Sequence, residues 1–198
     1  PATTTYTWDY KNRMTKLTGV TPANSPIFLY DHLGSRVYYA TTTANPRINW
    51  GGIYDTYNTK KTKHIYGNGV LLATIETVNT TATPYYVHTD HLGGTSIITN
   101  AAGTAVQSLD YYPYGGARVS TKTTAFDERK KFIGEMYDAE SQLSYLNARY
   151  YNGVTGKFVS QDPMFLGDPN KQRLMNPQEL NAYSYAAGNP INASDPSG

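Results

Sequence analysis

The sequence predicts an all-β fold: an array of antiparallel β-hairpins that forms one long twisted sheet, closed by a small irregular C-terminal cap. Three observations support this. The 198 residues include 19 tyrosines against 5 phenylalanines, and threonine is abundant; tyrosine and threonine both suit a half-buried pleated surface. Related strand–turn–strand units recur along the first part of the chain. Proline and turn-forming residues dominate its last part.

The recurring unit combines an aromatic strand end, an aspartate and a tight turn. Residues 30–37 (YDHLGSRV) have a near copy at 88–95 (HTDHLGGT), with looser versions at 8–13, 54–58 and 110–115. The aspartates of these units are Asp9, Asp31, Asp55, Asp90 and Asp110, spaced by 22, 24, 35 and 20 residues. Each unit is therefore predicted to be one hairpin of residues 1–120, the sheet segment.

The turn chemistry of this unit is explicit. An aspartate can accept hydrogen bonds from backbone groups two residues on, and glycine or asparagine supplies the positive φ of a tight turn. Beyond the turn, strand alternation predicts that Arg36, Tyr38 and Ala40 face one way, and that Val37 and Tyr39 face the other.

Residues 121–198 are predicted to be a second region. Residues 121–131 are polar and predict a loop, and residues 143–151 predict one strand. The turn at 152–156 then leads to a return strand at 157–160. In the proline-rich end, one short helix is predicted from Asn176 as N-cap, Pro177 in the first turn and Glu179 at the capping-box position, with Gly188 as the stop.

Composition argues against several classes of function. The formal charge of +2 lacks the basic excess of a nucleic-acid-binding protein. The absence of cysteine excludes disulfides, thiol nucleophiles and thiolate metal sites. No apolar run approaches the ~20 residues that span a membrane. His88 and Asp90 share a strand face while His91 points away, which gives too few ligands for zinc. We therefore expect no metal and no cofactor.

Three stretches carry a resemblance to a known family. They are residues 88–95 with 110–115, residues 132–140 with 147–151 and 156–163, and residues 181–190 with 195–198. In this order they resemble the RHS-repeat-associated core of bacterial RHS and YD-repeat proteins, a group that includes Tc-toxin C components and polymorphic toxins. The resemblance covers most of residues 80–198.

The resemblance implies a hollow shell of spiralling β-hairpins that encloses a variable C-terminal toxin, in a secreted or cell-surface protein. It implies as partners the remainder of its own shell and that effector. Residues 121–198 would be the core that folds inward and plugs one end. In many members this core cleaves the chain once, just after an Asp-Pro-x-Gly motif, by aspartyl-type chemistry. The matching carboxylates here are Asp162 and Asp195.

Two close carboxylates can divide the work of hydrolysis. Because they cannot both ionise cheaply, one keeps a proton and donates it, while the other activates a water. Arg149 can orient one carboxylate by a bidentate contact. The residues alone also allow a plain turn at each of the three Asp-Pro pairs, which begin at Asp162, Asp168 and Asp195.

This sequence departs from the family pattern. The two aspartates are 33 residues apart, longer than the family usually shows, with the excess in 164–179. The hydrophobic residue that normally follows the motif is absent after Gly198. Three interpretations fit these departures: the chain is a shortened piece, it is the product of a cleavage, or it is a family member that does not cleave.

Two further expectations concern partners. The alternative function is an extracellular adhesion module whose tyrosines stack on glycans; cross-strand packing explains the same tyrosines more simply. A fragment of an open sheet also leaves unpaired edges, which predicts self-association through them.

Overall fold

The computed structural model describes residues 4–19, 25–41, 45–163 and 181–198, and these residues form two antiparallel sheets. The large sheet has 12 strands whose spatial order is their order along the chain. It comprises β1 (Thr5–Trp8), β2 (Met14–Thr18), β3 (Ile27–Tyr30), β4 (Arg36–Ala40), β5 (Arg47–Trp50), β6 (Tyr54–Tyr57), β7 (Lys60–Gly67), β8 (Val70–Val78), β9 (Thr81–Thr89), β10 (Thr95–Thr99), β11 (Ala105–Tyr111) and β12 (Ala117–Lys122). The predicted all-β hairpin array is confirmed.

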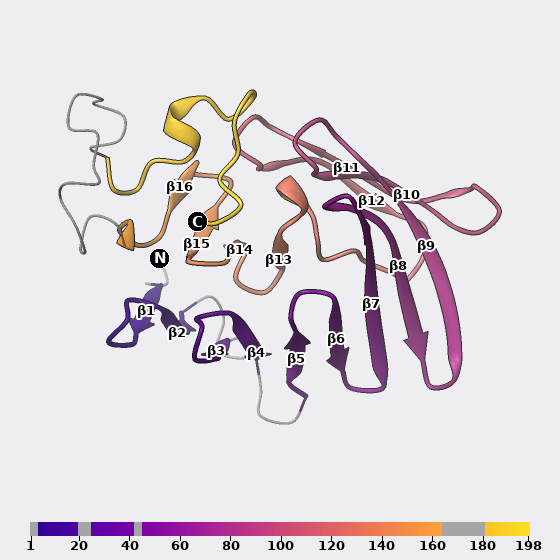
Figure 1. Cartoon of the computed structure of the whole chain (residues 1–198), viewed down its shortest axis with the longest axis horizontal. Helices are drawn as coiled ribbons and strands as arrows, with labels where there is room; N and C mark the ends of the chain where they lie inside the picture. The colour runs from indigo at the N-terminus through magenta and orange to yellow at the C-terminus, as the bar shows by residue number, and fades with distance from the viewer. Residues whose placement is uncertain (1–3, 20–24, 42–44, 164–180) are drawn as a thin grey trace.

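The second sheet has four strands and is formed by the C-terminal region. Its strands, again in chain order, are β13 (Met136–Asp138), β14 (Leu143–Leu146), β15 (Arg149–Asn152) and β16 (Lys157–Phe158). Figure 1 shows the large sheet as a curved wall with the smaller sheet on its inner side. The large sheet is open, because β1 and β12 are its two ends.

Aspartate builds three of the hairpin turns in the predicted way. The Asp31 carboxylate accepts hydrogen bonds from the backbone N–H groups of Leu33 and Ser35, both at 2.9 Å. Gly34 completes that turn with a φ of 95°, which favours glycine. Asp9 and Asp90 accept the equivalent backbone bonds in their own turns.

The prediction was wrong for the turns assigned to Asp55 and Asp110. Asp55 lies within β6, and its buried carboxylate accepts a hydrogen bond from Arg47 rather than from a turn. Asp110 lies within β11, and the turn follows it, closed by a hydrogen bond from the Gly115 N–H to the Tyr112 carbonyl.

The predicted alternation of β4 is also wrong. A β-bulge between Leu29 and Tyr30 shifts the register of β3 against β4. As a result Arg36 and Tyr39 both face the smaller sheet, and the Arg36 guanidinium lies 5.5 Å from the centre of the Tyr39 ring. This bulge allows a charged side chain to enter the space between the sheets.

Aromatic side chains fill the space between the two sheets. From the large sheet, Met14, Leu17, Phe28 and Tyr39 pack against Met136, Leu143, Tyr145 and Tyr150 of the smaller one. The Phe28 and Tyr150 rings are 4.9 Å apart, centre to centre. A second cluster, which includes Phe132, Tyr151 and Tyr185, joins the C-terminal segment to the smaller sheet.

The C-terminal region differs from its prediction in one turn. Residues 143–151, predicted as one strand, are the two strands β14 and β15, because the chain reverses at Asn147, whose φ is 54°. The turn at 152–156 is found as predicted. The predicted start of the short helix, from Asn176 to Glu179, lies outside the described residues, and Gly188 ends a single 3-10 turn, Ala186–Gly188.

Candidate functional site

The tight turn between β14 and β15 holds the end of the chain. The Ala148 N–H donates to the Ser197 carbonyl at 3.0 Å, and the Asn147 side-chain amide donates to the Pro196 carbonyl at 2.8 Å. Figure 1 shows the end of the chain beside β15. The Asp-Pro-Ser-Gly motif is thus fixed against a hairpin rather than extending away from the molecule.

Gly198 fits this turn because it has no side chain. Its φ is 72°, in the region that favours glycine. A Cβ at this position would lie 2.0 Å from the Leu146 carbonyl oxygen and 2.9 Å from the Arg149 backbone nitrogen. Any larger residue would therefore push the end of the chain out of its place.

Arg149 connects all the predicted site residues. One guanidinium nitrogen, Nη2, lies 3.2 Å from Asp162 Oδ2 and 3.5 Å from Asp195 Oδ2. Its Nε donates to the Gly198 oxygen at 2.6 Å. The side chain is only 4% exposed, and it lies 3.6 Å above the centre of the Phe158 ring. The structure thus places Asp162, Asp195 and Arg149 together, with the arginine touching both carboxylates.

The two oxygens of Asp195 have different partners. Oδ1 accepts hydrogen bonds from the Gly198 N–H at 3.0 Å and from the Ser197 hydroxyl at 2.9 Å, which is a turn role. Oδ2 faces Arg149. Asp195 therefore has both roles at once: one oxygen of its carboxylate stabilises the turn, and the other contacts Arg149.

The electrostatics of this site centre on the arginine. Burial lowers the pKa of Arg149, and the two carboxylates partly oppose that effect. A guanidinium stays charged in proteins, so Arg149 offsets the mutual repulsion of the two acids. It also places a charged donor on the Gly198 oxygen, where negative charge would develop if water attacked that carbonyl.

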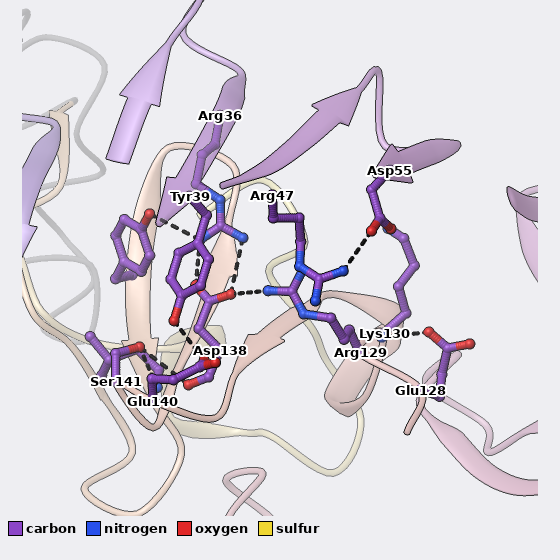
Figure 2. A network of polar contacts seen from close by, with 12 residues as sticks. Arg36, Tyr39, Arg47, Asp55, Glu128, Arg129, Lys130, Asp138, Glu140 and Ser141 are labelled. Carbon is purple, nitrogen blue, oxygen red and sulfur yellow. Dashed lines mark hydrogen bonds and ion pairs between the residues drawn. The ribbon is translucent and has the colours of Figure 1, made fainter. Parts of the chain in front are cut away.

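A second polar site, which the sequence did not reveal, lies between the two sheets (Figure 2). Asp138 is fully buried, and it pairs with Arg36 from β4 and with Arg129 from the segment before β13. Arg36 Nη1 also donates to the Tyr150 hydroxyl at 3.1 Å. Asp138 belongs to one of the family-like stretches, and this was the available signal. Arg36 gave no such signal, because the predicted alternation placed it on the opposite face from Tyr39, whereas the bulge brings the two together.

The same network continues along the large sheet. Arg47 donates to Asp55 Oδ1 at 2.6 Å, and His64 Nε2 lies 3.4 Å from Asp55 Oδ2. On its other side, His64 Nδ1 lies 3.2 Å from the Thr74 hydroxyl, which donates to Glu128. These contacts link β6, β7 and β8 to Glu128 of the connecting segment.

The histidines discussed as metal ligands have other contacts. His91 donates from Nε2 to the Ile191 carbonyl at 2.7 Å, and His88 Nε2 lies 3.2 Å from the Thr99 hydroxyl. Within the described residues, no group of three or more histidine, aspartate or glutamate side chains is placed to hold a metal ion. In the same part of the chain, no helix is long and apolar enough to cross a membrane.

Comparison with known proteins agrees with this architecture. The sequence matches the Teneurin YD-shell family over residues 27–191. It is 31% identical to the tRNA3(Ser)-specific nuclease WapA of Bacillus spizizenii over 98% of this chain and 8% of that protein. It is 27% identical to the double-stranded DNA deaminase toxin A of Burkholderia cenocepacia over 63% of this chain and 8% of that protein.

Solved structures show the same fold. The crystal structure of TcdB2-TccC3-TEV superposes with a TM-score of 0.80 at 17% identity, over 98% of this chain and 10% of that chain. This chain belongs to the Teneurin YD-shell family. More specifically, it is an RHS/YD-repeat shell protein related to toxin-associated members, and it spans about 8% of the length of the curated relatives named above.

Removing the negative charge of Asp138 should destabilise the protein strongly. In Asp138→Asn the side-chain volume is kept, but Arg36 and Arg129 lose their charged partner in a buried place. Breaking a buried ion pair in this way costs about 3–5 kcal/mol. We expect a loss of that size in urea unfolding followed by circular dichroism. Asp110→Asn, which removes an exposed partner of Arg118, is the control and should cost under about 1 kcal/mol. Equal losses in the two variants would contradict the proposed role.

Glu135 should make stability depend on pH. Burial raises its pKa to about 7 from 4.5, with Lys130 opposing the shift. A carboxyl whose pKa is raised in the folded state binds its proton more tightly there than in the unfolded chain. The free energy of unfolding of the protein therefore falls as the pH rises from about 4.5 to about 7.

Glu135→Gln removes this titration. We expect the variant to gain stability over wild type across that range, by up to about 3 kcal/mol at pH 8, as measured by urea unfolding at several pH values. A difference between the two proteins that does not change with pH would refute this prediction.

Proposed function

We propose that this chain is the segment of an RHS-type shell at which the wall ends and the C-terminal effector begins. The observation that carries this proposal is the position of the tail. The Asp-Pro-Ser-Gly motif is pinned to the β14–β15 turn, and the smaller sheet lies on the inner side of the large one. A chain that continued past Gly198 would start from this fixed point.

The division of labour follows the two sheets. We propose that residues 1–120 form part of the shell wall and that residues 121–198 form the core that closes the shell. The two observed sheets support this division, because the strands of the large sheet lie within residues 5–122 and those of the smaller sheet within residues 136–158. Packing accounts for the five buried tyrosines, which are Tyr39, Tyr145, Tyr150, Tyr151 and Tyr185. Other tyrosines, such as Tyr10, Tyr86 and Tyr112, are exposed and are the ones that a glycan-binding fibre would use. A secreted or surface location is part of the same proposal, supported by the similarity to the deaminase toxin of Burkholderia cenocepacia.

We further propose a single self-cleavage after Gly198. Water attacks the Gly198 carbonyl carbon, one carboxylate of Asp162 and Asp195 accepts the water proton, and Arg149 stabilises the oxygen that becomes negative. The C–N bond after Gly198 breaks, the new terminus keeps the water oxygen, and a proton passes to the departing amine. The contact of Arg149 with both acids and with Gly198 supports this arrangement. One chain cleaves once, because the site consumes its own substrate.

The test is a chain extended beyond Gly198 by a reporter. We expect the wild type to release the reporter, with a new terminus at Gly198 by intact mass. Asp162→Asn and Asp195→Asn should reduce the rate by about 100-fold or more, since each removes an acid–base group. Asp168→Asn, at the second of the three Asp-Pro pairs of the sequence, is the matched control and should cleave normally. Equal cleavage in all variants, or none in any, would remove the self-cleavage proposal.

The open edges of the large sheet should make the isolated segment associate. All six residues of β12 are exposed, and within the described sheet this strand has one neighbour, β11. Unpaired strand edges template further strands.

We expect light scattering to show mass growing with concentration, and Val119→Lys, which adds a charge to β12, to reduce that growth. Val154→Lys, in an exposed turn, is the control. A clean monomer at every concentration would contradict the prediction.

A further inference from the structure

One planar face of the Arg149 guanidinium is covered by an aromatic ring. Its central carbon, Cζ, lies 3.6 Å from the centre of the Phe158 ring. Arg149 and Tyr151 share a face of β15, because side chains alternate along a strand. Phe158 of β16 is the cross-strand partner of Tyr151, so its ring lies on that same face. The pairing of β15 with β16 therefore places the ring beside the arginine.

The edge of the same guanidinium faces acceptors from the C-terminal part of the chain. Nε donates to the Gly198 oxygen at 2.6 Å, and Nη1 donates to the Ala182 carbonyl at 2.9 Å. Nη2 faces the carboxylates of Asp162 and Asp195. All these donors belong to one rigid plane. A tilt of that plane moves every contact together, so the tilt decides whether Nε reaches the Gly198 oxygen.

The Phe158 ring is itself held in place. It is 3% exposed, and its centre lies 5.5 Å from that of the Tyr151 ring and 6.0 Å from that of the Tyr185 ring. The Phe158 backbone N–H donates to the Tyr183 carbonyl at 3.1 Å. The face of an aromatic ring is negative and attracts a cation above it, most strongly where water is excluded. A ring that is packed on its other sides therefore gives the guanidinium one preferred orientation.

We propose that Phe158 is a positioning residue for the self-cleavage: its ring fixes the tilt of the Arg149 guanidinium so that Nε points at the Gly198 oxygen. The inference rests on the proposed function, because it gives Phe158 a part in that cleavage. The ring has no polar atom, so it acts only through Arg149. The two carboxylates attract Nη2, whereas the ring acts on the whole plane and opposes a tilt that would favour the acids over the Gly198 oxygen.

The first experiment needs no cleavage. In the 198-residue chain, NMR follows hydrogen exchange of the Arg149 Nε–H, whose resonance is identified by its loss in Arg149→Lys. We expect this proton to exchange about tenfold faster in Phe158→Leu, the size of a lost cation–π contact shielded from water. Phe158→Tyr keeps the ring and should stay near the wild type.

Phe132→Leu is the matched control for this experiment. Phe132 belongs to the same buried aromatic cluster as Phe158, but it packs on Tyr151 and Tyr185. We expect its exchange rate at Arg149 to stay within about twofold of the wild type, the usual limit of additivity between separate sites. Equal acceleration in the two leucine variants would show a purely structural role and would overturn the inference.

A fluorinated phenylalanine separates the attraction from the packing. Fluorination nearly keeps the shape of the ring but makes its face less negative, so the protein folds even where a leucine is not tolerated. At position 158 this residue should speed the exchange of the Arg149 Nε–H, and at position 132 it should not. Unchanged exchange with the fluorinated ring at position 158 would overturn the inference.

The last experiment measures release of the reporter from the extended chain. We expect Phe158→Leu to cleave about tenfold more slowly than the wild type, and Phe158→Tyr and Phe132→Leu to cleave within about twofold of it. If the wild type does not cleave while the exchange rates differ as expected, the self-cleavage proposal fails and the hold of Phe158 on Arg149 is confirmed. If the wild type and Phe158→Leu cleave at one rate, self-cleavage stands and the positioning inference fails.

Discussion

A carboxylate with no access to water, Asp138, lies between the two sheets and must be paired there. Its partners come from different parts of the chain, Arg36 from the fourth strand of the wall and Arg129 from the connecting segment. Because an unpaired buried charge is so costly, the pairing of Asp138 with Arg36 favours the observed placement of the smaller sheet on the larger. The apolar contacts around them, such as Phe28 on Tyr150, add stability but would tolerate small shifts.

The placement of the smaller sheet decides where the chain ends. The β14–β15 turn is part of that sheet, and it provides the backbone and side-chain donors that hold Pro196 and Ser197. Gly198 then fits against Leu146 only because it lacks a Cβ. The buried ion pair between the sheets therefore helps to set the position of the Asp-Pro-Ser-Gly motif at the β14–β15 turn.

The wall itself follows a simpler rule. Each Asp-based turn satisfies its own backbone donors, so the hairpins are local units that add in chain order, and the sheet has no crossover. Such a construction leaves the two end strands open, and curvature leaves an inner face to be covered. One of the relatives named above, from Burkholderia cenocepacia, is itself named as a toxin.

The sequence by itself determined the all-β class, the family and the turns at Asp9, Asp31 and Asp90, since local turn chemistry and short motifs encode them. The role of Asp162 and Asp195 as a carboxylate pair stays a prediction. The sequence did not determine that Asp55 is a buried ion-pair partner, that Arg36 faces inward, or that the chain reverses at Asn147. The position of Arg36 depends on a bulge and on a carboxylate far away in the chain, and the position of Asp55 depends on Arg47 and His64 of the neighbouring strands. Only the tertiary structure decides them, because the cost of burying a charge is set by which partner the fold brings to it.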